Sequence, residues 1–245
     1  MENMTKWFEK YDVPTDDQLL QYGVDWDLVI KHAEILGPQV LNELCRVIGG
    51  DLCEKKILDF GCGLGRISLK MYDLIKQPTH ACDVNQFSTD WLSKQLPEID
   101  IQNTGFKPPL PYDDETFDAI FSISIWRHLH PKMQIPWLVE LRRILKPGGY
   151  ALVSIAGIES FKRRQAKYEE WQKFTEKDVK LQGVLFTEYK LLRKVPDGFP
   201  GIEDSYGSTI HDSDFVKECW GCLFDSLEIR EGAIAGSQDL VVMKR

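Results

Sequence analysis

The chain has 245 residues, 43% of them hydrophobic and 28% charged, a balance that excludes an intrinsically disordered protein. The formal net charge of −8 at pH 7 is unfavourable for binding phosphates, so nucleic acid is not an expected partner. No apolar run approaches the roughly 18 residues of a membrane span, and the charged N-terminus lacks an export signal, so a cytoplasmic protein that does not bind membranes is expected.

Residues 1–50 are expected to form an N-terminal helical segment. Apolar residues between Leu28 and Ile48 recur at helical spacing, and Gly49-Gly50 ends the run. Pro38 suits the first turn of a helix, because its missing N–H is not needed there.

From Lys56 onward, short apolar strands alternate with amphipathic helices, which predicts a parallel sheet with right-handed crossovers. The strands are expected at 57–60, 80–84, 99–102, 117–124 and 150–155, and the later helices at 87–96 and 136–145. This pattern defines a core over 51–157, which the glycine-rich loop described below makes the expected cofactor-binding part. It is followed by an insertion over 158–208 that opens with a charged helix at 161–181. The last part, 209–245, carries a helix at 212–220 and strands at 226–231 and 239–244. All of these parts are assigned to one domain.

Cys219 and Cys222 have the spacing of a metal or redox pair. No second ligand pair accompanies them, and they are interpreted as residues in the last turn of a helix. No metal site is therefore predicted.

A glycine-rich loop follows the first strand of the core. Gly61, Gly63 and Gly65 lie between a strand and a helix, where glycine lets the backbone approach a ligand that any Cβ would block. Asp83 ends the next strand, 20 residues after Gly63, and a carboxylate there can accept both hydroxyls of a ribose.

The loop does not fit a dinucleotide. Arg66 occupies the sixth position, where the dinucleotide fingerprint has glycine, and no Gly-Lys-Ser/Thr sequence closes a phosphate-binding loop. The negative charge of Asp59 would repel a pyrophosphate, but it suits a ligand that has an ammonium group and no phosphate. S-adenosylmethionine is such a ligand.

Three blocks of the sequence resemble the class I S-adenosylmethionine-dependent methyltransferases. They are residues 56–66, 108–129 and 138–149, in the family's order and spacing, and 238–244 is similar to its last strand. The resemblance implies a Rossmann-like, doubly wound α/β sheet of seven strands, mostly parallel with an antiparallel last strand. It also implies a lid-like insertion before the last two strands.

The resemblance implies roles in cofactor binding. The three loop glycines would support the methionine end, with Cys62 packed beneath the loop and Asp59 reaching the amino group. Asp83 would hold the ribose. The remaining residues would lie near the adenine or line the pocket, and they are Val84, Asn103, Thr104, Ser122 and Ser124. Arg66 would either meet the cofactor carboxylate or be an exposed residue of the first helical turn.

The acceptor side is less defined. Methyl transfer needs a nucleophile aligned with the methyl group, and sometimes a base. His211 and Tyr206, where the insertion returns to the core, are candidate bases, with a helix-entry role as the alternative for His211. His128, after the fourth strand, is a third candidate, and histidines at this place in the family usually cap a helix.

The acceptor is predicted by elimination. Ser122-Ile-Ser-Ile stands where methyltransferases of base amines have an Asn/Asp-Pro-Pro-aromatic motif, and no cluster of metal ligands is apparent. A small hydroxylated molecule, a sugar or a natural product, is therefore expected to be O-methylated. A non-catalytic scaffold that retains the fold and, less favoured, a nicotinamide-dependent oxidoreductase remain as alternatives.

Overall fold

The computed structural model describes residues 7–15, 19, 25–188 and 207–245. The chain forms two compact units, Met1–Thr104 and Gly105–Arg245, which are described separately. The predicted core over 51–157 contributes to both units, and the single-domain organisation stays a prediction. Tyr206, one of the candidate bases, lies outside the described residues, as does the rest of 189–206.

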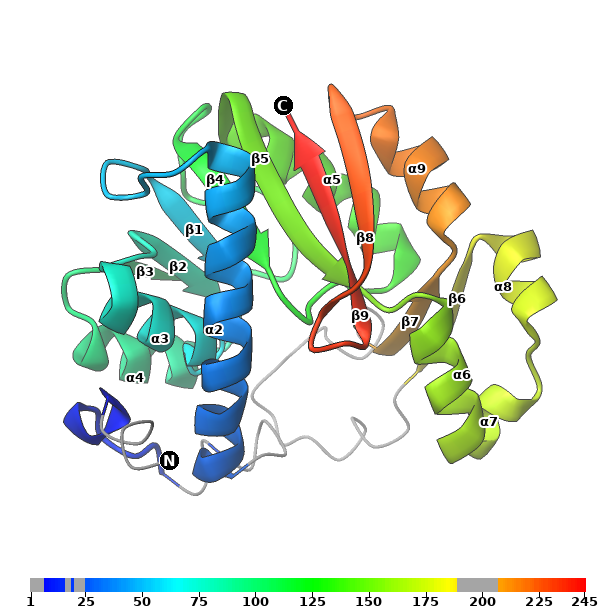
Figure 1. Ribbon diagram of the computed structural model, residues 1–245, viewed down its shortest axis with the longest axis horizontal. Helices are drawn as coiled ribbons and strands as arrows, with labels where there is room; N and C mark the ends of the chain where they lie inside the picture. The colour runs from blue at the N-terminus through cyan, green and yellow to red at the C-terminus, as the bar shows by residue number, and fades with distance from the viewer. Residues whose placement is uncertain (1–6, 16–18, 20–24, 189–206) are drawn as a thin grey trace. The chain divides into compact units, whose positions relative to one another are not determined.

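The first unit contains three parallel strands and the helices between them (Figure 1). Strand β1 pairs with β2, and β2 pairs with β3, both in parallel. In chain order its elements are η1 (Trp7–Lys10), α2 (Trp26–Ile48), β1 (Ile57–Phe60), α3 (Arg66–Ile75), β2 (His80–Asp83), α4 (Gln86–Gln95) and β3 (Asp100–Asn103).

The second unit continues the alternation and then adds antiparallel strands. Strand β4 pairs with β5 in parallel, whereas β9 runs antiparallel to both β5 and β8. Its elements are β4 (Phe117–Ser122), α5 (Pro131–Ile144), β5 (Leu145–Ile155), α6 (Ile158–Lys167), α7 (Glu169–Gln172), α8 (Glu176–Gln182), β6 (Val184–Glu188), β7 (Gly207–His211), α9 (Ser213–Gly221), β8 (Ser226–Ile234) and β9 (Gln238–Lys244).

The strands form a seven-stranded sheet in the order β3-β2-β1-β4-β5-β9-β8. The order reverses after β3, which is the doubly wound arrangement of Rossmann-like folds, and β9 is the antiparallel last strand. The predicted fold class is confirmed. Among the described residues, no helix is long and apolar enough to cross a membrane.

Helix α2 is longer than the sequence pattern indicated. The pattern suggested a helix starting at Pro38, but Pro38 lies inside one continuous helix. A proline here leaves the carbonyl of Glu34 without its helical donor. The buried side chains of Leu36 and Val40 flank the proline and keep both halves of the helix on one apolar face. The burial of this face stabilises the helix by more than the lost hydrogen bond costs.

Helix α5 begins earlier than expected, because Pro131 and not Pro136 provides the first turn. The backbone N–H of Lys132 donates to Nδ1 of His130, which therefore caps the helix.

The insertion also differs from the prediction of one charged helix at 161–181. Tyr168 is extended and ends α6, and a capping box between Thr175 and Asp178 starts α8. The insertion further contains a two-stranded antiparallel sheet, β6–β7, that was not predicted. His211 is the last residue of β7 and directly precedes Asp212, which caps α9.

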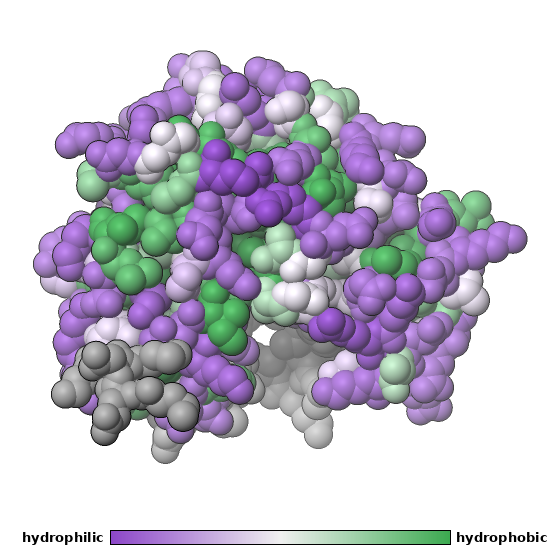
Figure 2. All heavy atoms as spheres, in the orientation of Figure 1, coloured by the Kyte–Doolittle hydropathy of each residue, from purple (hydrophilic) through white to green (hydrophobic). Residues whose placement is uncertain are grey.

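Large apolar side chains are mostly buried, as expected for a folded protein. Figure 2 shows that hydrophilic residues cover most of the visible face, with small apolar patches between them. The most exposed large apolar residues of the described chain are Val13, Phe87 and Leu181. Apolar residues exposed in this scattered way carry no functional meaning by themselves.

Candidate functional site

The glycine loop turns sharply between β1 and α3. Gly61, Gly63 and Gly65 have φ values of 81°, 53° and 70°, in the left-handed region that favours glycine. The backbone N–H groups of Gly61 and Cys62 both donate to the carbonyl of Cys82, at 2.8 and 3.0 Å. A Cβ on Gly65 would collide with Leu92 of α4. The loop is therefore held tightly against β2 and α4.

Asp83 ends β2 beside this loop, as the sequence indicated. Its Oδ2 accepts from the N–H of Gly63 and its Oδ1 from the N–H of Asn85, each at 2.8 Å. Burial raises the pKa of the Asp83 carboxyl, whereas these backbone donors lower it. Each oxygen retains a second lone pair, so the carboxylate can accept two further hydrogen bonds from a ligand.

Asp59, the residue before the last of β1, carries a buried carboxyl group, and 2% of its surface is exposed. The hydroxyl of Ser68 donates to its Oδ2 at 2.6 Å. Burial raises the pKa of Asp59 to about 7, although the hydrogen bond from Ser68 and the charge of Arg66 lower it. A buried carboxyl group of this kind gains stability from a cationic ligand.

Arg66 opens α3 and is partly exposed. Its positive charge lowers the pKa of Asp59, and it also lowers the pKa of His32, for which burial is the larger cause. His32 of α2 is therefore close enough to Arg66 to be affected by its charge. Sequence reasoning did not identify His32, because α2 shows only an amphipathic pattern and no motif.

The residues expected near adenine follow β2 and β3. The amide of Asn103 donates to the carbonyls of Asp83 and Val84 at 3.2 Å, and the N–H of Thr104 donates to the carbonyl of Asp83 at 3.0 Å. Asn103 and Thr104 thus fix the end of β2 that carries Asp83. A contact of either with adenine stays a prediction.

Two loop residues belong to an apolar cluster of the first unit. They are Cys62 and Leu64, and the cluster also contains residues from α4. The N-terminal residues join it through Tyr11 and the partly buried Trp7. The indole N–H of Trp7 donates to Glu34. The first unit therefore supports its loop with apolar packing and a polar anchor on α2.

In the second unit, Ser122 is the last residue of β4 and Ser124 follows the strand. Ser122 is fully buried, and its Oγ has no hydrogen-bond partner in the described part of the chain. Ser124 has a φ of 66°, which is costly for a residue with a side chain. The N–H of Ser124 donates to Oγ of Ser154 at 2.7 Å, and the amide of Gln238 donates to Oγ of Ser124 at 2.9 Å.

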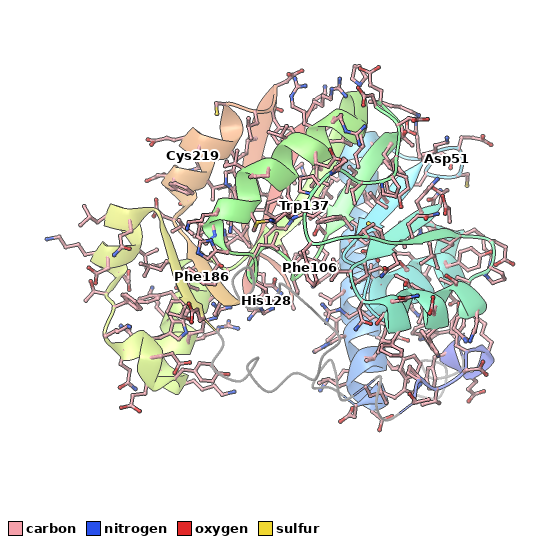
Figure 3. All side chains as sticks on the ribbon, turned by 180° about the vertical axis from the view of Figure 1, so that it is seen from behind. Asp51, Phe106, His128, Trp137, Phe186 and Cys219 are labelled. Atoms are coloured by element: carbon pink, nitrogen blue, oxygen red, sulfur yellow. The ribbon has the colours of Figure 1, made fainter. Side chains whose placement is uncertain are left out.

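His128 lies between β4 and α5 and does not cap the helix; His130 does. Its Nδ1 is 3.0 Å from the carbonyl oxygen of Gly207. Since a carbonyl only accepts, Nδ1 carries the proton and Nε2 is the basic nitrogen of the neutral ring. Figure 3 labels His128 together with Phe186 of β6, the strand that pairs with β7.

His211 is buried, with 1% of its surface exposed, and burial lowers its pKa to about 3. Its Nε2 lies 3.2 Å from Oε1 of Gln134, whose amide donates to the carbonyl of Leu129. Its ring packs edge-on against Trp220, at 5.5 Å between centroids. His211 is therefore neutral and links β7 to α5 and α9. This environment favours a positioning role over that of a proton acceptor.

No group of three or more His, Cys, Asp or Glu residues that could hold a metal ion occurs within 7–15, 19, 25–188 and 207–245. Cys219 and Cys222 lie at the end of α9, where Sγ of Cys222 donates to the carbonyl of Cys219 at 3.0 Å. This is the helix-end position that the sequence predicted for them.

Part of the chain is similar to known methyltransferases. Residues 57–149 match a family model described as a methyltransferase domain. A fatty-acid O-methyltransferase of Mycolicibacterium smegmatis is 26% identical over 125 residues, which are 50% of this chain and 43% of that protein. A tRNA (carboxymethyluridine(34)-5-O)-methyltransferase of Mus musculus is 24% identical over 187 residues, covering 74% of this chain and 26% of the relative. The chain spans less than half the length of these relatives.

Among solved structures, the complex of DhpI with SAH has a TM-score of 0.58 at 12% identity, covering 94% of this chain and 91% of that chain. This likeness shows a shared fold. The matched residues, 57–149, include the glycine loop, Asp83 and β4. This part of the chain, with the site that it carries, therefore resembles a methyltransferase domain.

Proposed function

We propose that this protein binds S-adenosylmethionine and transfers its methyl group to an oxygen atom of a small hydroxylated acceptor. The observation that carries the proposal is the pairing of Asp83 with the glycine loop. The carboxylate is fixed by two backbone donors and keeps an accepting lone pair on each oxygen. The two hydroxyls of a ribose match this arrangement.

The loop fits the other end of the same ligand. Its glycines offer backbone without side chains, and Asp59 provides a buried carboxyl group near the positive charge of Arg66. An amino acid group has both an ammonium, which Asp59 would attract, and a carboxylate, which Arg66 would attract. A pyrophosphate would be repelled by Asp59, so a nicotinamide dinucleotide fits less well.

The cofactor supplies an electrophilic methyl group, and the protein supplies position and a proton acceptor. We assign the proton acceptor to His128, because the carbonyl of Gly207 fixes its tautomer with Nε2 basic. Tyr206 stays a candidate that lies outside the described residues. His211 is assigned to positioning.

The choice of a small oxygen acceptor rests on two supports. The relative from Mycolicibacterium smegmatis is named for O-methylation of a fatty acid. The net charge of −8 disfavours nucleic acid, although a tRNA methyltransferase is also among the relatives. An RNA acceptor is therefore the second candidate, and it predicts binding that weakens steeply with salt.

Calorimetric titration of the protein with S-adenosylmethionine, S-adenosylhomocysteine and NAD tests the cofactor assignment. We expect the two adenosyl ligands to bind and NAD not to bind. Release of S-adenosylhomocysteine in the presence of an acceptor panel then tests transfer. Binding without turnover on any acceptor would favour a non-catalytic scaffold, and binding of NAD alone would favour an oxidoreductase.

Cofactor affinity is expected to rise with pH because Asp59 must lose its proton to attract the ammonium group. With a pKa of about 7 in the free protein, the charged fraction at pH 8 is about ten times that at pH 6. The dissociation constant should therefore fall by about tenfold between these values. The same titration with adenosine, which lacks the ammonium group, should be flat. In Asp59→Asn, a pH dependence equal to that of the wild type would contradict this role.

A further inference from the structure

The segment Ser122–Arg127, which runs from the last residue of β4 toward α5, carries buried polar atoms that have no partner within the fold. Within the described residues, Oγ of Ser122, the indole N–H of Trp126 and Nε of Arg127 have no hydrogen-bond partner. Indole and guanidinium nitrogens only donate, and a hydroxyl can do so. Buried donors without acceptors are costly, and such groups call for an explanation such as an absent ligand.

The segment is held firmly at its start. Ser124 keeps its left-handed backbone because its N–H donates to Ser154, its Oγ accepts from Gln238, and Oγ of Ser154 donates to Oε1 of Gln238 at 3.0 Å. Ser154 and Gln238 are both buried, with 0% and 6% of their surfaces exposed. We call these three residues the serine–glutamine latch. A strained residue held by a buried network is a feature of functional sites.

The other end of the segment is bound to β7. The N–H of Thr209 donates to the carbonyl of Arg127 at 2.8 Å, and the N–H of Gly207 donates to the carbonyl of His128 at 2.7 Å. The guanidinium of the buried Arg164 donates to Ser208 and to the carbonyl of Thr209. The positive charge of Arg164 therefore lies against β7, the strand that fixes the main chain of Arg127.

Arg127 itself is half-buried, and in the structure as described it makes no ion pair with an acidic side chain. In a protein with 38 acidic residues, a partly buried guanidinium without a carboxylate partner is unusual. The guanidinium fork matches the geometry of a carboxylate, to which it can donate two parallel hydrogen bonds.

We propose that Ser122–Arg127 binds the acceptor and that the acceptor carries a carboxylate group, which Arg127 holds. The proposal rests on the methyltransferase function above and names the class of its acceptor as a small organic acid. The latch positions the segment, and His128 follows directly after Arg127 in the chain.

The test is calorimetric titration with hexanoate and benzoate, each paired with its neutral analogue, 1-hexanol or benzyl alcohol. The titrations use the free protein and the protein saturated with S-adenosylhomocysteine. We expect at least one carboxylate to bind more tightly than its alcohol. Arg127→Gln should lower the affinity for that carboxylate by about 10- to 100-fold, because hydrogen bonds to a charged group are lost.

The matched control is Arg163→Gln. Arg163 lies on α6 in the same unit and donates to the carbonyl of Gly236 at the surface. This substitution should change the affinity for the carboxylate by no more than about twofold. A carboxylate that binds no better than its alcohol, or that is insensitive to Arg127→Gln, overturns the proposal. Failure of S-adenosylhomocysteine to bind instead overturns the proposed function.

The positioning role of the latch is tested by a second substitution that should restore the binding lost in a first one. Gln238→Ala should lower the affinity for the carboxylate about fivefold, because Ser124 loses one of the hydrogen bonds that hold its strained backbone. Adding Ser124→Gly should restore binding, since glycine adopts positive φ without cost. If the double variant binds no better than Gln238→Ala alone, the latch does not position this segment.

Discussion

Replacing Asp83 by alanine is expected to weaken the binding of S-adenosylmethionine by about 10²- to 10⁴-fold. A hydrogen bond to a charged group contributes about 1.5–3 kcal/mol, and the carboxylate would accept one from each ribose hydroxyl. The loss of two such bonds corresponds to this change in affinity. The variant also leaves the N–H groups of Gly63 and Asn85 without their acceptor, which loosens the loop.

Calorimetry on Asp83→Ala measures the effect, and two variants make it specific. Asp83→Asn keeps the size of the side chain but loses the charge, so its affinity should lie between those of the wild type and the alanine variant. Asp90→Ala removes an exposed carboxylate from α4 of the same unit and should leave affinity unchanged. A loss of less than tenfold in Asp83→Ala would mean that the ribose is held elsewhere.

The cofactor side could be predicted from sequence because its determinants are local. Three glycines within five residues require a turn with positive φ, and the following helix and strand place Asp83 beside it. The structure brings these residues together as expected. What the sequence could not show was the burial of Asp59, on which its raised pKa depends, because burial is set by the packing around β1.

The acceptor side was harder to predict because its histidines depend on tertiary contacts. The sequence favoured His211 over His128, since His211 stands where the insertion returns to the core. In the structure, β7 pairs with the unpredicted strand β6, and this pairing buries His211 against Trp220. His128 instead meets the carbonyl of Gly207, 79 residues away in the chain. No local pattern encodes a contact between such distant residues.

The serine–glutamine latch was missed for the same reason. Ser124 was expected near the cofactor from its position after β4, but nothing in the local sequence indicates its positive φ. Its partners Ser154 and Gln238 come from β5 and β9, and only the order of strands in the sheet brings β5 and β9 together. The antiparallel register pairs Ser154 with Leu240, two residues from Gln238.

His128→Asn is expected to lower kcat by about 10²- to 10⁴-fold, the usual contribution of a general base. Asparagine retains a donor for the carbonyl of Gly207, so the local structure should survive while the basic nitrogen is lost. The dissociation constant for S-adenosylmethionine should not change. The measurement is the rate of S-adenosylhomocysteine release with the best acceptor from the panel.

The same substitution two residues later provides the control. His130 caps α5 by accepting from the N–H of Lys132, and asparagine is a good helix cap, so His130→Asn should keep kcat within about twofold. A His128→Asn variant that keeps the kcat of the wild type would remove His128 from the mechanism. The acceptor would then have to arrive already ionised or be deprotonated by another group.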